Sequence, residues 1–435
     1  MADITAIRGR RVFDSRGNPT VEAEVTLADG AIGRAIAPAG ASRGTREAID
    51  LRDGGERLRG KDVRSAVAHV NGLIADALAD REASDQAGID AALVVLDPSP
   101  LKATIGGNAT VAVSLAVLHA AAASARKPLW RHIADHWSRT PSLPLPEIQI
   151  SGGGAHAGRR VDVQDFMIMV PGASSFDEVM DVTSAVYFAA GELMAKKGRL
   201  AGVADEGGWW PVFSSNEEAL ETLAEAIERA GEARSGRVVI SLDIAASEFG
   251  KDGRYRLALE DRELDSGAMI DLLGRWIDAY PIASIEDPLA EDDTAGMRAF
   301  TERFGESVQI IGDDYLVTNA ALVERAAREG ACNAVLIKVN QAGTVSEAFA
   351  TFAAAEAAGW RAIVSARSGE TEDVSISHIA TGLGAGQLKV GSFTRSERMA
   401  KWNECLRIGD ALPEGAFVGG RPLARTWWGQ ERPTV

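Results

Sequence analysis

The chain has 435 residues, which is too long for one ordinary hydrophobic core and favours two domains, one of them large enough to be a barrel. Hydrophobic residues make up 46% and charged residues 25%, as in soluble globular proteins. The formal net charge of −16 argues against non-specific nucleic-acid binding, which requires a basic face, but it leaves room for a small anionic substrate held by local arginines or a metal ion.

Cys332 and Cys405 are the only cysteines, so a disulfide framework is not expected and a reducing compartment is the natural setting. The first residues, MADITAIRGR, carry charge early and lack the apolar core of a signal peptide. We find no run of about 18 apolar residues of the kind that spans a membrane. The sequence therefore predicts a cytoplasmic protein without a membrane or nucleic-acid partner.

The first forty residues are expected to form a three-stranded antiparallel meander. ADITAIRGRRVFDS (2–15) and TVEAEVTLADG (20–30) alternate apolar and polar residues, and the SRGNPT between them has the composition of a turn. A third short strand follows in residues 31–40. Helical spacing of apolar residues then appears over 62–80 and 109–137, and the second tract is so rich in alanine that it must pack closely against another element.

PSLPLPE, residues 141–147, has three prolines in seven positions and is the best candidate for an interdomain linker. We therefore divide the chain into an N-terminal α+β capping domain, residues 1–138, and a catalytic domain with a C-terminal tail, residues 139–435. In the second part short apolar runs alternate with amphipathic helices, which favours parallel strands joined by crossover helices. A closed (β/α)8-type barrel fits the length, whereas an open doubly wound sheet lacks its early Gly-x-Gly-x-x-Gly signature.

Charged residues end several of the expected barrel strands. Asp243, Glu286 and Asp313 end three of them, and Lys338 and Lys389 lie in two more. The carboxyl ends of barrel strands meet at one mouth, where active sites form, so three acids from three strands could converge on Mg²⁺. A lysine beside such a metal has a lowered pKa and becomes a candidate general base.

Simpler readings exist for each of these residues taken singly. An acid at a strand end can cap the helix that follows, and a strand-end lysine can extend to solvent. Glu206, in VADEGGWWP, could belong to an ordinary surface turn, and His156, in SGGGAHAGRR, lies in a glycine-rich loop that is a weak signal alone. Three acids and two lysines in consecutive units favour the functional interpretation.

A series of motifs in one order carries a family resemblance over residues 3–410. They are DSRGNPTVE, PAGAS, HAG, DEGG, SLDIAASEF, SIEDP, GDD, IKVNQAGTVSEA, RSGETED and RSERMAKWNECLRI. Together they resemble enolase, the glycolytic phosphopyruvate hydratase. The resemblance implies a capping domain on a barrel, two Mg²⁺ ions per active site, and a homodimer or larger assembly of dimers.

The resemblance also implies roles for residues at matching positions. Asp243, Glu286 and Asp313 resemble the ligands of the tighter Mg²⁺, and Ser42, in a mobile loop, resembles a ligand of the second. Lys338 resembles the base that removes the proton beside the carboxylate, while Lys389 binds that carboxylate. Glu206 resembles the acid that protonates the departing hydroxide, with His156 and Asp165 nearby. Arg367 and Ser368 resemble phosphate ligands.

The chain departs from the family pattern around the substrate. Ala366 stands where enolases carry a histidine in Ser-His-Arg-Ser, Arg43 where the mobile loop carries a threonine, and Arg159 where an asparagine follows His-Ala-Gly. Asp165 replaces a residue that is usually glutamate. These changes remove an imidazole and add two guanidinium groups, which suits a substrate that is larger and more anionic at phosphorus.

Carboxyphosphonoenolpyruvate synthase, an enolase-like enzyme of phosphonate antibiotic biosynthesis, has a product with a carboxylate on phosphorus. We therefore expect a dehydratase of that kind, with Ala366 providing space and Arg43 or Arg159 a counter-charge. An ordinary glycolytic enolase and a non-catalytic enolase scaffold are the alternatives, and a sugar-acid dehydratase would lack the Arg367–Ser368 clamp. The tail, residues 419–435, is expected either to pack at a subunit interface or to be disordered.

Overall fold

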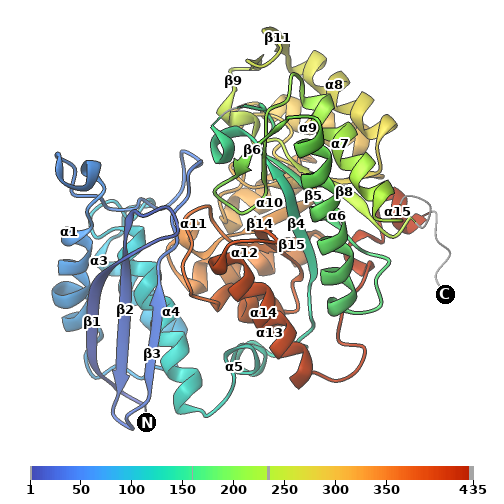
Figure 1. Ribbon diagram of the computed structural model, residues 1–435. Helices are drawn as coiled ribbons and strands as arrows, with labels where there is room; N and C mark the ends of the chain where they lie inside the picture. Colours follow the sequence, from blue (N-terminus) through green and yellow to red (C-terminus); the bar gives the residue numbers. More distant parts are fainter. Residues whose placement is uncertain (1, 159, 233–235, 431–435) are drawn as a thin grey trace.

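The computed structural model describes residues 2–158, 160–232 and 236–430, and it shows a small N-terminal domain set against one end of a barrel (Figure 1). The small domain contains an antiparallel meander in the order β1-β2-β3, as the sequence predicts. Its main elements are β1 Ile4–Phe13, β2 Pro19–Leu27, β3 Ile32–Ile36, α1 Arg64–His69, α2 Ala75–Leu78, α3 Gln86–Leu96, α4 Gly107–Ser124 and α5 Leu129–His136.

The alanine-rich helix α4 packs directly on the meander, which explains its composition. A Cβ added at Gly33 of β3 would lie 2.1 Å from Ala116 O and from Ala120 N, so the strand can approach the helix backbone this closely only with glycine at position 33. The expected tract over 109–137 is two helices and not one, because Arg126 has a positive φ of 52° and Pro128 precedes α5. The expectation that no run is long and apolar enough to cross a membrane is wrong for α4 by length and composition, but 83% of this helix is buried inside the protein.

Eight strands form the barrel, which closes where β16 pairs with β4. In order around the barrel they are β4 Leu145–Gly152, β5 Asp165–Met169, β8 Val239–Asp243, β12 Ile282–Glu286, β13 Gln309–Gly312, β14 Ala334–Ile337, β15 Arg361–Ser365 and β16 Gly386–Ser392. The expectation of uniformly parallel strands is wrong for β5, which is antiparallel to both β4 and β8. β5 follows β4 without a crossover helix, and such a short connection joins antiparallel neighbours.

Helices surround the barrel, and a few short strands extend it. The helices are α6 Phe176–Lys196, α7 Asn216–Arg229, α8 Ser266–Ala279, α9 Thr294–Phe304, α10 Ala320–Glu329, α11 Val339–Ala342, α12 Val345–Ala357, α13 Ser375–Leu383 and α14 Ser396–Ala411. The additional strands are β6 Leu200–Val203, β7 Trp209–Pro211, β9 Gly250–Lys251, β10 Arg254–Leu257 and β11 Arg262–Asp265. The expected linker, 141–147, is partly strand, since β4 begins at Leu145.

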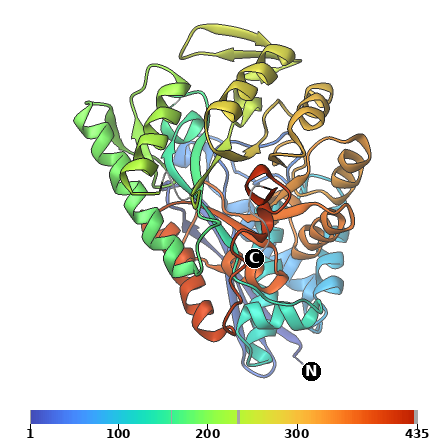
Figure 2. The same ribbon diagram turned by 90° about the vertical axis from the view of Figure 1, so that its right-hand side faces the viewer.

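The C-terminal segment covers the end of the barrel opposite the small domain (Figures 1 and 2). It contains η5 Arg421–Leu423 and α15 Trp427–Gln430. Trp427 donates from Nε1 to Ile282 O at 2.7 Å, and Trp428 donates to Gly236 O at 2.8 Å. Leu423, Trp427 and Trp428 join a small apolar cluster with the barrel-strand residues Leu145, Met169, Val239 and Ala283. The part of the tail that the structure describes therefore packs on its own chain, and residues 431–435 lie outside the described residues.

Candidate active site

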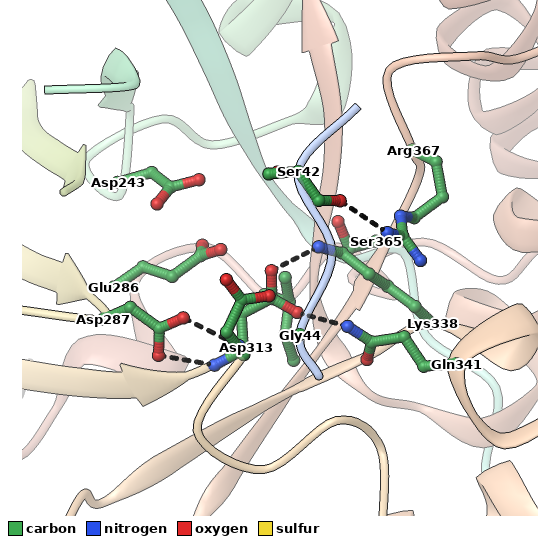
Figure 3. Close-up of polar contacts among 12 residues, drawn as sticks. Ser42, Gly44, Asp243, Glu286, Asp287, Asp313, Lys338, Gln341, Ser365 and Arg367 are labelled. Carbon is green, nitrogen blue, oxygen red and sulfur yellow. Dashed lines mark hydrogen bonds and ion pairs between the residues drawn. The ribbon is translucent and has the colours of Figure 1, made fainter. Parts of the chain in front are cut away.

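The barrel end that faces the small domain gathers the charged residues singled out from the sequence. Asp243 and Glu286 end β8 and β12, Asp313 follows β13, Lys338 follows β14 and Lys389 lies within β16. Asp165 reaches the same mouth from the first position of β5, because that strand runs in the opposite direction. Figure 3 shows the side chains of Asp243, Glu286, Asp313 and Lys338 turned toward a common centre.

A small pocket opens at this mouth. Most of the predicted site residues line it, while Glu286 and Asp313 lie beside it. The lining residues are Gly40, Ala41, Ser42, His156, Gln164, Asp165, Glu206, Asp243, Lys338, Ser365, Ala366, Arg367, Ser368, Lys389, Val390 and Gly391. Residues from both expected domains therefore contribute to one cavity.

Lys389 is the most densely paired cation in the pocket. Its Nζ donates to Asp243 Oδ2 at 2.8 Å and to Glu286 Oε2 at 2.7 Å, and it lies 3.9 Å from Asp165 Oδ2. Gln164 also donates to Asp243 Oδ2, at 3.0 Å. Burial alone would lower the pKa of Lys389, but Asp243 and Glu286 outweigh burial and raise it well above its usual value. The ammonium is therefore a fixed positive charge at physiological pH.

Lys338 is buried and paired with one carboxylate. Its Nζ donates to Asp313 Oδ2, while Gln341 Nε2 donates to Asp313 Oδ1 at 2.8 Å (Figure 3). Burial would lower the pKa of Lys338, but Asp313 raises it. Asp287 accepts the backbone N–H of Asp313 at 2.9 Å and that of Asp314 at 2.7 Å, and this fixes the turn after β13. Because Asp313 favours the charged form of Lys338, the amine can become neutral only when Asp313 pairs with another cation.

The carboxylates at the mouth fit a hard divalent cation. Glu286 is fully buried, and its Oε1 has no hydrogen-bond partner among the described residues. Burial and the neighbouring Asp243 raise the pKa of Glu286 well above its usual value, which is the signature of acids gathered without enough positive charge. Oxygen ligands of this kind suit Mg²⁺. In this structure Asp243 and Glu286 pair with the Lys389 ammonium, and Asp313 pairs with that of Lys338. Among the described residues, two other groups bring three possible ligand atoms within 4.8 Å of one another: His156–Asp165–Glu206 and Asp287–Asp313–Asp314.

On the opposite wall, His156 lies between two acids. Its Nδ1 is 3.0 Å from Asp165 Oδ1 and its Nε2 is 3.7 Å from Glu206 Oε1. Burial would lower the pKa of His156, but Asp165 and Glu206 raise it to about 9. The imidazolium can therefore hold Glu206 over the pocket. Gln149 of β4 donates to Asp165 and accepts from Gly208 N at 2.9 Å, which ties Asp165 to the loop that carries Glu206.

Arg367 connects the loop after β15 to the loop that carries Ser42. It donates from NH1 and NH2 to Glu47 at 2.8 and 3.2 Å, and from NH2 to Ser42 O at 3.0 Å. NH1 also lies 3.3 Å from Asn340 Oδ1. Both members of the Arg367–Glu47 pair are almost completely buried, with side-chain exposures of 4% and 1%. An anion in the pocket competes with Glu47 for this guanidinium.

The backbone of the same loop is held from behind by α14. The fully buried Arg398 donates from NH1 to Arg367 O at 2.6 Å and to Val390 O at 2.8 Å, and from NH2 to Ser368 O at 2.5 Å. Ala366 donates its N–H to Lys389 O at 2.9 Å. These hydrogen bonds hold the backbone of Ala366, Arg367 and Ser368 from behind.

The two arginines predicted as counter-charges have different outcomes. Arg43 does not line the pocket: its NH2 donates to Ala48 O at 2.8 Å, and its Nε lies 3.8 Å from Glu47 Oε2. Arg159 lies outside the described residues. Ala366 lines the pocket together with its neighbours Arg367 and Ser368.

Sequence reasoning missed Glu47, Gln341, Gln164 and Gln149, all of which contact predicted site residues. It also missed Glu147, which is fully buried inside the barrel. One signal was available: in EIQIS, residues 147–151, polar side chains alternate with isoleucine, which indicates a strand with one polar, inward face. Glu47 had no such signal, since its partner lies 320 residues further along the chain.

A barrel capped by an α+β domain, with acids and lysines at the covered mouth, has the architecture of the enolase superfamily of lyases. Comparison with protein families matches residues 4–133 to the enolase N-terminal domain and residues 140–426 to the enolase C-terminal TIM barrel domain. The chain therefore belongs to the enolase family.

Proposed function

We propose that this lyase removes water from a 2-phosphoglycerate-like substrate that carries an additional carboxylate on phosphorus, as expected of an enzyme similar to carboxyphosphonoenolpyruvate synthase. The observation that carries the proposal is the small side chain of Ala366 in the pocket wall, next to Arg367 and Ser368. Lys338, Lys389 and Glu206, to which we assign proton transfer and carboxylate binding, line the same pocket.

Proton removal is assigned to Lys338. Asp313 is the partner that keeps Lys338 charged in this structure, and Mg²⁺ held by Asp243, Glu286 and Asp313 would supply the positive charge that stabilises a developing carboxylate dianion. With Asp313 engaged elsewhere, burial favours the neutral Lys338 amine, which can then accept a carbon-bound proton. Lys389 remains cationic and binds the substrate carboxylate. Ser42, from the opposite side, is assigned to a second Mg²⁺.

Protonation of the leaving hydroxide is assigned to Glu206, on the pocket wall that also carries His156. Glu206 is 6% exposed and faces the cavity, with the His156 imidazolium between it and Asp165. Glu206 can donate a proton to the departing oxygen once it has taken one up, since the neighbouring imidazolium favours its carboxylate form. Asp165 holds the imidazole by its other nitrogen and fixes which edge faces Glu206.

The phosphorus end of the substrate is assigned to the loop after β15. Arg367 and Ser368 bind phosphoryl oxygens, and the additional carboxylate occupies the volume beside Ala366. Arg159 is the remaining candidate counter-charge, since Arg43 contacts the Ala48 carbonyl. A guanidinium and a carboxylate shielded from water form a strong two-point interaction.

The test compares two substrates with purified protein and Mg²⁺. Phosphorus NMR would follow 2-phosphoglycerate and its analogue with a carboxylate on phosphorus in parallel reactions. We expect the analogue to be dehydrated with the higher kcat/KM. Turnover of 2-phosphoglycerate at the rates of ordinary enolases, without preference for the analogue, would contradict the proposal.

An ordinary enolase is the second candidate, and one observation favours it: Arg43 does not reach the pocket, so one of the two added charges is not in place there. A non-catalytic scaffold is less consistent with two buried lysines and converging acids at one mouth. The homodimeric assembly, the cytoplasmic location and the domain division at residue 138 are further proposals, and the assembly is open to test by light scattering.

A further inference from the structure

Glu147 is a buried acid that the reaction described above does not use. It lies in β4, directly across from Lys389 in the β16–β4 ladder. Paired residues of neighbouring strands point to the same side of a sheet, and both side chains are buried at 0% and 6% exposure, so Glu147 faces the barrel interior with Lys389.

Only half of this carboxylate is satisfied within the described residues. Ser241 donates its hydroxyl to Glu147 Oε1, whereas Glu147 Oε2 is buried without a hydrogen-bond partner. An unpaired buried carboxylate oxygen costs several kcal/mol in order of magnitude, so its retention calls for a compensating interaction. Burial raises the pKa of Glu147, and Lys389 is the charge that opposes this rise most strongly.

Lys389 has two sets of acidic neighbours, and only one set is engaged. Asp243 and Glu286 accept its hydrogen bonds, yet these are the carboxylates assigned to Mg²⁺. The second set consists of Asp165, whose Oδ2 is 3.9 Å away and also buried without a partner among the described residues, and Glu147. The second set can receive the ammonium when the first is taken.

We propose that Glu147 is a positioning residue for Lys389, which receives the ammonium when a divalent cation takes Asp243 and Glu286. The inference rests on the proposed function for its metal site and adds a residue to it. Without Glu147 the divalent cation has to compete with Lys389 for Asp243 and Glu286, because the Lys389 ammonium then has too little negative charge elsewhere to pair with.

The test is a double-mutant cycle in Mg²⁺ binding, measured by calorimetry on the full-length, chelator-treated protein without substrate. We expect Glu147→Gln to weaken Mg²⁺ binding about tenfold in the otherwise unchanged protein, and less than about twofold when Lys389→Met is also present. Ser241→Ala is the matched control, since it removes the hydrogen bond to Glu147 and keeps the carboxylate, and it should leave binding unchanged.

Each outcome distinguishes the two proposals. If Glu147→Gln weakens Mg²⁺ binding equally with and without Lys389→Met, Glu147 acts on the metal site through its charge or its packing and not through Lys389. If Ser241→Ala weakens Mg²⁺ binding as much as Glu147→Gln does, the effect is one of packing. Either result would overturn the inference while leaving the metal site intact. No Mg²⁺ binding by the unchanged protein would overturn the proposed function as well. If Glu147→Gln fails to fold, Glu147→Met gives the same cycle, because an apolar residue of similar length removes the buried charge and its desolvation cost together.

Discussion

Glu47 and Arg367 form a buried ion pair that joins the N-terminal loop bearing Ser42 to the loop after β15. Both terminal nitrogens of the guanidinium take part, at 2.8 and 3.2 Å. The residue assigned to substrate phosphorus is therefore also a structural tie between two chain segments 320 positions apart.

Glu47→Gln is expected to reduce the free energy of unfolding by roughly 3 kcal/mol or more, because it leaves the Arg367 charge buried without its counter-ion. Urea denaturation followed by circular dichroism would measure this. Glu24→Gln is a suitable control: Glu24 pairs with Arg34, whose side chain is 55% exposed, so its loss should cost no more than about 1 kcal/mol. Similar costs for both variants would contradict the buried-pair interpretation.

Lys338→Met should abolish exchange of the substrate proton next to the carboxylate, with a fall in kcat of roughly 100- to 10,000-fold. Proton NMR in deuterated water reports this exchange independently of product formation. Lys102→Met provides a comparison, because Lys102 is also buried and paired, at 2.9 Å from Glu347, but does not line the pocket. Undiminished exchange in Lys338→Met would remove this residue from the role of base.

Ala366→His should fill the opening beside Arg367. We expect kcat/KM for the carboxylated analogue to fall by at least about tenfold, equivalent to ~1.4 kcal/mol of transition-state binding, while activity on 2-phosphoglycerate is kept or rises. Ala366→Ser changes polarity with little added volume and should have a smaller effect. If Ala366→His leaves the preference between the two substrates unaltered, specificity resides elsewhere.

Mg²⁺ should stabilise the folded protein through the acids at the barrel mouth. At a concentration 100 times the dissociation constant, the expected gain is about 2.7 kcal/mol, visible as a rise in the thermal unfolding midpoint. Asp243→Asn should remove most of that rise. Asp261→Asn is the control and should preserve the rise in the unfolding midpoint, because the Asp261 side chain is 87% exposed on the surface. If the rise survives Asp243→Asn, Mg²⁺ binds somewhere other than at Asp243.

The pH dependence of His156 follows from its neighbours. Its pKa is raised from 6.5 to about 9, so its stabilising contribution is complete below about pH 6.5 and is lost as the pH rises through about 9. The stability advantage of the unchanged protein over His156→Gln should therefore shrink between these values. NMR of the imidazole C–H signals in chelator-treated protein would follow the titration of His156 directly. His132 is the opposite case in the same spectra, because burial and the neighbouring His136 lower its pKa to about 4.

The sequence was sufficient where a local pattern carries the information. Asp243 and Glu286 each follow a short apolar run, and such a run with an acid at its end predicts a barrel strand with a charged mouth residue. The closed barrel and the antiparallel meander were predictable for the same reason. The direction of β5 was not, because the four successive apolar residues of DFMIM predict a buried strand without fixing the direction in which it runs.

Long-range pairings were beyond the reach of sequence patterns. Nothing near Glu47 indicates that Arg367 is its partner, and nothing near Arg43 indicates that its guanidinium turns to the Ala48 carbonyl. These side-chain choices depend on which loops the fold brings together. The packing of the C-terminal helix α15 was equally unpredictable from the sequence, since Trp427 donates to the carbonyl of Ile282, a residue 145 positions earlier.

The hydrogen bonds from Arg398 to the carbonyls of Arg367 and Ser368 have an evolutionary consequence. They make the backbone of this loop a rigid mount whose shape is independent of the side chain at position 366. Exchanging that one residue can then change the wall of the pocket without disturbing the backbone that carries Arg367 and Ser368. New specificities within such a lineage can arise by single-codon changes, with no stage at which the scaffold must be rebuilt.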